Sequence, residues 1–141
     1  MKRDVVLSVR GQQNYIGQEP DVIELVTEGT MEYKDGGWEI QYQESALTGM
    51  EGVTTTFRVE STGITLTRTG KLYSQMVFRE GQPHDSLYQM GFGALMITVC
   101  AKRIMVQLDS TGGMVDLIYD IDIEKGTAGQ VDYHLDIQVI E

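Results

Sequence analysis

The chain has 141 residues, and its 21 Asp and Glu outnumber its 11 Lys and Arg, which gives a formal net charge of −10. This charge argues against a groove for nucleic acid, because such grooves use basic residues to neutralise phosphates, and against binding to anionic membranes. No apolar run approaches the roughly 18 residues of a membrane helix, and the single cysteine, Cys100, excludes an intrachain disulfide and a thiolate metal cage. We expect one soluble, cytoplasmic domain spanning residues 1–141, with no cofactor and no metal.

Apolar and polar residues alternate through most of the chain, and this period of two is typical of half-buried β-strands. Trp38, Ile40 and Tyr42, for example, share one predicted face, while Glu39 and Gln41 lie on the other. No segment shows a helical stripe. In chain order, the pattern predicts strands at residues 4–11, 22–33, 37–46, 53–60, 63–69, 72–80, 87–90, 93–100, 103–110, 113–124 and 130–140.

Glycine-containing turns separate the predicted strands, as at Asp35-Gly36-Gly37 and Gly112-Gly113. Glycine supplies the positive φ that tight hairpin turns require, and short turns between successive strands produce a meander. Closing the meander on itself would remove exposed strand edges. We therefore predict an all-β fold, a single antiparallel meander barrel of about 8–10 strands. The irregular segments 11–20, 45–52 and 81–91 are its candidate rims.

Two charged residues fall on the apolar faces of their predicted strands. Glu44 follows Ile40 and Tyr42 by twos, and Arg68 follows Leu66. Buried charges are costly when unpaired, so each should meet an opposite charge or a hydroxyl. Three interpretations remain open. The two residues could form a structural ion pair that plugs the barrel, they could anchor a ligand whose carboxylate or phosphate binds Arg68, or they could both reach solvent at the rim.

The two histidines offer weaker signals. His84, which precedes Asp85 and Ser86, is expected to lie in a solvated loop rather than in a catalytic triad, because no nucleophile motif is present. His134 is expected on the acidic outer face of the last hairpin, opposite Asp120 or Asp122. That acidic face could bind a divalent cation through oxygen ligands, but a solvated surface that keeps the protein soluble is the simpler interpretation.

Motifs along most of the chain resemble the YwiB-like family of small uncharacterised bacterial proteins. The specific part is Tyr42-Gln43-Glu44, followed by Leu-Thr-Gly-Met-Glu-Gly at 47–52 and by Thr54-Thr55-Thr56. Weaker matches are residues 66–70 and 75–78, Gly81, His84, Tyr88, Gly93, Gly112-Gly113 and Tyr119. The chain departs from the family at Met90-Gly91-Phe92-Gly93, where the family tends to have Thr-Pro-Tyr-Gly. The resemblance implies a calycin-like (lipocalin-type) β-barrel and no assigned activity.

The leading hypothesis is a non-enzymatic barrel that binds a small, apolar, carboxylate-bearing ligand in its interior. The predicted ligand-binding residues are Tyr42, Glu44, Phe57, Leu66, Arg68, Met76, His84, Tyr88 and Tyr119. The alternative is a protein-interaction or structural module with a filled core and a structural Glu44–Arg68 ion pair. A third hypothesis is an enzyme that uses Glu44 and His84 as acid and base. The sequence favours a binding protein, predicts no catalytic residue, and leaves the oligomeric state open.

Overall fold

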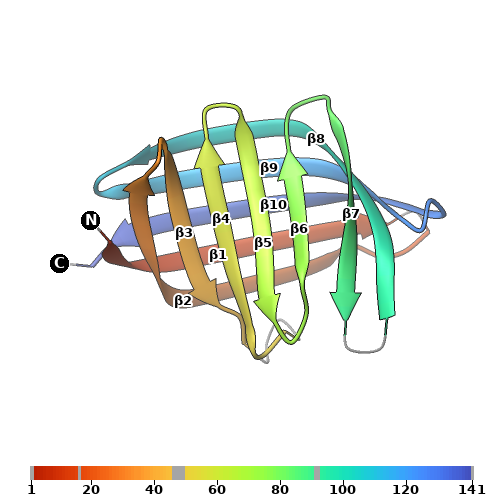
Figure 1. Ribbon diagram of the computed structural model, residues 1–141, viewed down its shortest axis with the longest axis horizontal. Coiled ribbons are helices and arrows are strands. Elements are labelled where there is room, and N and C mark those ends of the chain that lie inside the picture. The colour runs from red at the N-terminus through yellow and green to blue at the C-terminus, as the bar shows by residue number, and fades with distance from the viewer. Residues whose placement is uncertain (1, 16, 46–49, 91–92, 141) are drawn as a thin grey trace.

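The computed structural model describes residues 2–15, 17–45, 50–90 and 93–140, and these form ten antiparallel strands in a nearly closed barrel (Figure 1). The predicted all-β meander barrel is therefore confirmed. The strands are β1 (Arg3–Tyr15), β2 (Asp21–Lys34), β3 (Gly37–Gln43), β4 (Val53–Glu60), β5 (Gly63–Gly70), β6 (Ser74–Phe78), β7 (Pro83–Met90), β8 (Gly93–Asp109), β9 (Gly112–Ile123) and β10 (Thr127–Val139). Among the described residues, no helix has the length and apolar character needed to cross a membrane.

Pairing between β1 and β10, near the two ends of the chain, joins the meander into one sheet with the order β6-β5-β4-β3-β2-β1-β10-β9-β8-β7. The two outermost strands of this order, β6 and β7, then approach each other. They meet at Tyr73 and Gln89, whose backbones exchange N–H···O bonds of 2.9 and 2.7 Å. This isolated contact, and not a full ladder, brings the barrel close to closure.

The barrel is flattened into two layers that enclose the core. Figure 1 shows β3 to β7 crossing in front of β8, β9, β10 and β1 at a steep angle. Alternate residues of every layer point inward, as the period-two pattern requires. Leu7, Ile40, Phe57, Leu66 and Leu135 are each at most 1% exposed, so apolar burial between the layers is the main source of stability.

The turn between β2 and β3 shows why the chain forms tight hairpins. Lys34 pairs with Gly37, which leaves Asp35 and Gly36 as a two-residue turn with φ of 52° and 80°. Positive φ at both positions is the geometry whose twist matches the right-handed twist of paired strands. An Asp-Gly sequence adopts it at low cost.

The two predicted strands at 93–100 and 103–110 are wrong as separate elements, because both belong to the single strand β8. A β-bulge between Ala101 and Arg103 shifts the register against β9 by one residue. Val99 and Ala101 point inward before the bulge, and Ile104 is the next inward residue after it. The bulge therefore interrupts the alternation although the strand itself continues.

Two of the three predicted rims also contain strand. β1 continues to Tyr15, paired with Gly129 of β10, and β7 pairs with β8 from Pro83 onward. Proline at the first position of a strand leaves the ladder intact. Of the third predicted rim, residues 46–49 lie outside the described residues, as do residues 91–92 of the segment that departs from the family motif.

Candidate functional site

A cavity of about 460 Å³ occupies one end of the barrel interior. Its apolar lining comes from both layers and consists of Val9, Ile23, Leu25, Met50, Met76, Leu95, Ile97, Ile121, Ile123 and Val131, with Gly11. Its polar lining consists of Gln13, Tyr15, Asp21, Tyr42, Glu44, Arg68, Tyr88, Tyr119 and Tyr133. The interior at this end is therefore an apolar chamber with a small group of polar side chains.

Arg68 is the cationic member of that group, and its position follows from the alternation along β5. Ile64 and Leu66 are each 1% exposed and point into the core, and Arg68 is the next inward position. Its backbone lies between Thr55 of β4 and Ser74 of β6. The Nε atom is fully buried and has no hydrogen-bond partner among the described residues. The guanidinium therefore reaches the cavity with donor capacity to spare.

The surroundings of Arg68 keep it charged. Burial disfavours the charged guanidinium, but Tyr133, Tyr119, Glu44 and Tyr42 outweigh this effect, so the pKa of Arg68 is raised. The opposite applies to the phenols: burial raises the pKa of Tyr119 and of Tyr133, although the charge of Arg68 opposes it in both. The site at neutral pH therefore holds one permanent cation among neutral hydroxyl groups.

Two of those hydroxyls join the two layers of the barrel. Tyr42 of β3 and Tyr133 of β10 have their hydroxyl oxygens 2.9 Å apart. The ring of Tyr133 also packs against Phe57, with ring centroids 5.4 Å apart. Burial, together with the nearby Tyr133 and Glu44, raises the pKa of Tyr42. One hydroxyl of the pair donates to the other, which leaves the second proton for a further acceptor.

Glu44 supplies the negative charge of the site. It is 6% exposed, and its Oε2 accepts a hydrogen bond of 2.6 Å from the hydroxyl of Thr55. Its backbone N–H also donates to the carbonyl of Val53, 2.8 Å away, so it lies at a fixed position beyond the end of β3. The prediction that Glu44 and Arg68 point inward is confirmed, and their charges sum to zero.

The structure brings six of the nine predicted ligand-binding residues together on the cavity wall: Tyr42, Glu44, Arg68, Met76, Tyr88 and Tyr119. Phe57 and Leu66 are buried in the packed core beside the cavity and do not line it. Sequence reasoning missed Tyr133 and Tyr15. Tyr133 was identifiable, because it shares the inward stripe of its predicted strand with Val131 and Leu135.

The prediction that His84 lies in a solvated loop is wrong. His84 belongs to β7, opposite Val99 of β8, and its Nδ1 is buried with no hydrogen-bond partner among the described residues. It is absent from the cavity lining, whereas Glu44 belongs to it. The structure therefore does not bring Glu44 and His84 together as an acid–base pair.

His134 lies opposite Asp116, not opposite Asp120 or Asp122, because the hairpin register differs from the predicted one. Its Nδ1 is 2.5 Å from Asp116 Oδ1, and its Nε2 is 3.0 Å from Asp136 Oδ2. The hydrogen bond to Asp116 is the main cause that raises the pKa of His134. In the part of the chain that the structure describes, no three His, Cys, Asp or Glu side chains gather as a metal site.

Comparison with known proteins places this arrangement in a family. A family model described as a domain of unknown function, DUF1934, matches residues 7–137. The chain belongs to the DUF1934 family. Among the solved structures, a crystal structure of the YwiB protein from Bacillus subtilis is similar over 96% of this chain and 92% of that one, with a TM-score of 0.82 and 22% identity. No curated protein matches the chain.

The resemblance to YwiB-like proteins predicted from the motifs is thus confirmed, and the YwiB structure shares the fold. Membership of DUF1934 assigns no activity to the chain, because the family is described only as a domain of unknown function. A shared fold does not fix a function, which depends on the side chains of the site.

Proposed function

We propose that this barrel binds a small molecule with an anionic group and an apolar body in the 460 Å³ cavity. The observation that carries the proposal is the buried Nε of Arg68, which has no partner among the described residues. A buried donor left without an acceptor costs roughly 1–3 kcal/mol, and a ligand oxygen would remove that cost.

The chemistry of the cavity supports an anion of carboxylate type. A guanidinium can present two parallel N–H donors to a carboxylate, and such charge-assisted bonds are about twice as strong as neutral ones. The neutral phenols of Tyr42, Tyr119 and Tyr133 stand around Arg68 and offer further donors. Glu44 is held by Thr55 and would repel a second negative charge, which favours a monoanion.

The rest of the lining supports an apolar body. Aliphatic side chains and two methionines, Met50 and Met76, form most of the wall. Methionine adapts its shape to irregular apolar surfaces. The volume lies inside the roughly 300–1,000 Å³ range of small-molecule sites, so the cavity suits one compact ligand and not a polymer.

A thermal-shift and native mass-spectrometry series tests the proposal. Saturated monocarboxylates of increasing chain length are compared with alcohols and amines of the same length. We expect the carboxylates to raise the melting temperature by several degrees, through preferential binding to the folded state. Arg68→Met should lose this shift. The matched control is Arg10→Met, because Arg10 lies on the outer face of β1 and pairs with Glu24 in solvent.

The electrostatic influence of Glu44 on Arg68 favours a second candidate, a structural ion pair in a module that meets its partners through its surface. In that case Arg68→Met would be more stable than the wild type, because a buried ion pair often stabilises less than apolar packing. No carboxylate would then raise the melting temperature of either protein.

We also propose a cytoplasmic location. The single free Cys100 supports it, since the cytoplasm keeps thiols reduced.

A further inference from the structure

The second half of β8 has an unpaired edge. β7 pairs with β8 only along residues 93–100, whereas β9 pairs with it as far as Asp109. Residues 103–109 therefore have no strand on the side away from β9, within the part of the chain that the structure describes. Figure 1 shows this half of β8 along the border of the back layer. An unpaired edge of this length is a template for a further strand.

One hydrogen bond fixes which backbone groups this edge presents. The N–H of Ile104 points away from β9 and donates to Glu80 Oε2, 2.8 Å away. Because the register is continuous from Arg103 to Asp109, the pattern repeats every second residue. Val106 and Leu108 thus direct their N–H and C=O groups outward in the same way. Glu80 covers the start of the edge and leaves its centre open.

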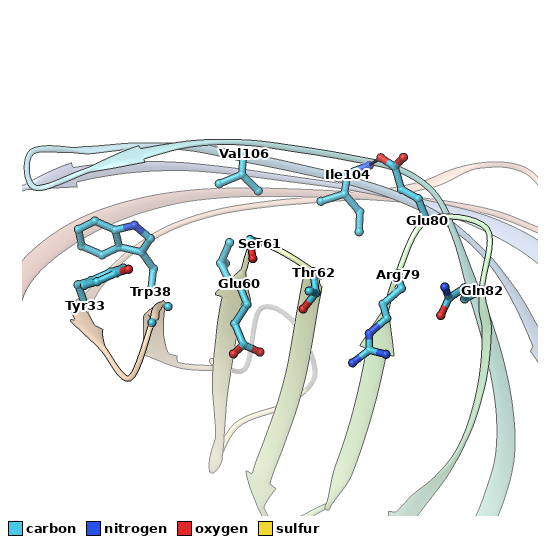
Figure 2. A pocket seen from close by; sticks show the side chains of 14 residues that line it. Tyr33, Trp38, Glu60, Ser61, Thr62, Arg79, Glu80, Gln82, Ile104 and Val106 are labelled. Carbon is cyan, nitrogen blue, oxygen red and sulfur yellow. Dashed lines mark hydrogen bonds between the residues drawn. The ribbon is translucent and has the colours of Figure 1, made fainter.

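The centre of the edge also lacks the usual protection against pairing. Natural edges carry charges, prolines or bulges that block a partner strand. Here the bulge and Lys102 lie at one end, and the Arg103 guanidinium lies on the outer face, where it donates to Met105 Sδ over 2.6 Å. Met105 and Val106 are still 37% and 38% exposed. Figure 2 shows Ile104 and Val106 pointing from β8 across an open groove of about 910 Å³ toward Glu60, Thr62 and Arg79.

We propose that this edge pairs with the same edge of a second copy of the chain, as an antiparallel strand centred on Val106. The charges at the two ends of the edge support a second copy as the partner. Antiparallel pairing about Val106 sets Arg103 opposite Asp109 of the second copy, and the two-fold symmetry repeats this contact at the other end. Asp109 already holds Thr111 through Oδ1, at 2.6 and 2.8 Å, so its Oδ2 remains available. No other symmetric register opposes these two residues.

The backbone geometry agrees with the same register. Val106 then faces its own equivalent, and Ile104 faces Leu108 of the second copy. All three residues direct their N–H and C=O groups outward, so each pair falls at a hydrogen-bonded position of the new ladder. Exposed Met105 pairs with Gln107 of the second copy on the outer face. The pairing extends the back layer from one barrel into the next and is independent of the proposed ligand cavity.

Sedimentation equilibrium on the full chain and its variants tests the inference. We expect a wild-type dimer, and we expect Val106→Pro to be a folded monomer, because proline on an edge removes only the outward N–H. Arg103→Glu should weaken the dimer about tenfold, since two attractive cross-strand contacts become repulsive. The double change Arg103→Glu with Asp109→Arg should restore it. Arg10→Glu, a matched control at an exposed position of β1, should leave it unchanged.

Amide hydrogen exchange adds a readout at the edge itself. The amides of Val106 and Leu108 should exchange more slowly at concentrations where the chain is dimeric than where it is monomeric. A wild type that sediments as a monomer at every concentration overturns the inference. So does a dimer that keeps its affinity in both Val106→Pro and Arg103→Glu, or a monomer whose edge amides are protected only when a foreign extended peptide is added.

Discussion

The hydroxyl oxygens of Tyr42 and Tyr133 lie 2.9 Å apart, although 91 positions separate the two residues in the chain. Tyr42 ends the inward stripe of β3 in the front layer, and Tyr133 belongs to β10 in the back layer. Their contact therefore joins the two layers at the wall of the cavity. Arg68 lies close enough to both tyrosines to influence their pKa values. The same hydrogen bond therefore links the two layers and belongs to the polar part of the cavity wall.

Tyr133→Phe should test the structural part of this contact. The ring and its packing against Phe57 are kept, and only the hydroxyl is lost. We expect the free energy of unfolding to fall by about 0.5–1.5 kcal/mol, the net value of a typical hydrogen bond. Urea denaturation measures it. Tyr33→Phe is the control, because Tyr33 is 54% exposed. Equal losses in the two variants would show that the hydroxyl contact contributes nothing.

Thr55→Val should lower the free energy of unfolding more than the same change at its exposed neighbour, Thr56. Thr55 is fully buried and donates to Glu44, so the variant removes a hydrogen bond from a carboxylate, a loss of about 1.5–3 kcal/mol. Thr56 faces outward and accepts from Gln41 at an exposed position. Thr56→Val should therefore change stability by no more than about 0.5 kcal/mol. Chemical denaturation of both variants measures the difference, and a smaller loss for Thr55→Val contradicts the assigned role of its hydroxyl.

Much of the fold could be predicted because side-chain alternation records which face of each strand is buried. The same counting found Glu44 and Arg68, since a charge on an apolar stripe is visible in the sequence. It could not locate the cavity along the strands. On β5, Leu66 and Arg68 share one face, but Leu66 is packed in the core and Arg68 reaches the cavity. Whether an inward residue packs in the core or lines the cavity depends on the local distance between the two layers. The sequence of one strand does not contain that distance.

Register and bulges set the other limits. Alternation fixes whether His134 pairs with an even or an odd position of β9, but it does not fix which, so Asp116 could not be distinguished from Asp120. The bulge before Arg103 inserts one residue into β8 and reverses the alternation beyond it. The sequence of this one continuous strand therefore has the pattern expected of two separate strands.

The turn between β9 and β10 should be a site where stability can be gained. Glu124 and Lys125 both have positive φ, at 53° and 57°, which costs an L-residue roughly 1–2 kcal/mol each. Glu124 also accepts a hydrogen bond from the N–H of Met96, so it should be kept. Lys125→Gly should raise the free energy of unfolding by about 0.5–1 kcal/mol, measured by thermal and urea denaturation. Lys71→Gly, at a position with ordinary φ, should not stabilise the protein.

His134 should make stability depend on pH with a defined sign. Its pKa in the folded state is raised above the usual 6.5, chiefly by the hydrogen bond to Asp116, with Asp136 adding to it. The stabilising contribution is therefore fully present below the unfolded pKa and is lost as pH rises through the folded pKa. The imidazole is 34% exposed, so solvent screening should keep the effect small.

The measurement is an NMR titration of the His134 ring together with urea denaturation of the wild type and His134→Gln between about pH 5 and about pH 9. The stability advantage of the wild type should shrink with rising pH, and the midpoint of the ring titration should lie above 6.5. Asp116→Asn should lower that midpoint more than Asp136→Asn, because Asp116 makes the shorter contact. An advantage that grows with pH, or a larger effect of Asp136→Asn, contradicts the assigned roles of the two carboxylates.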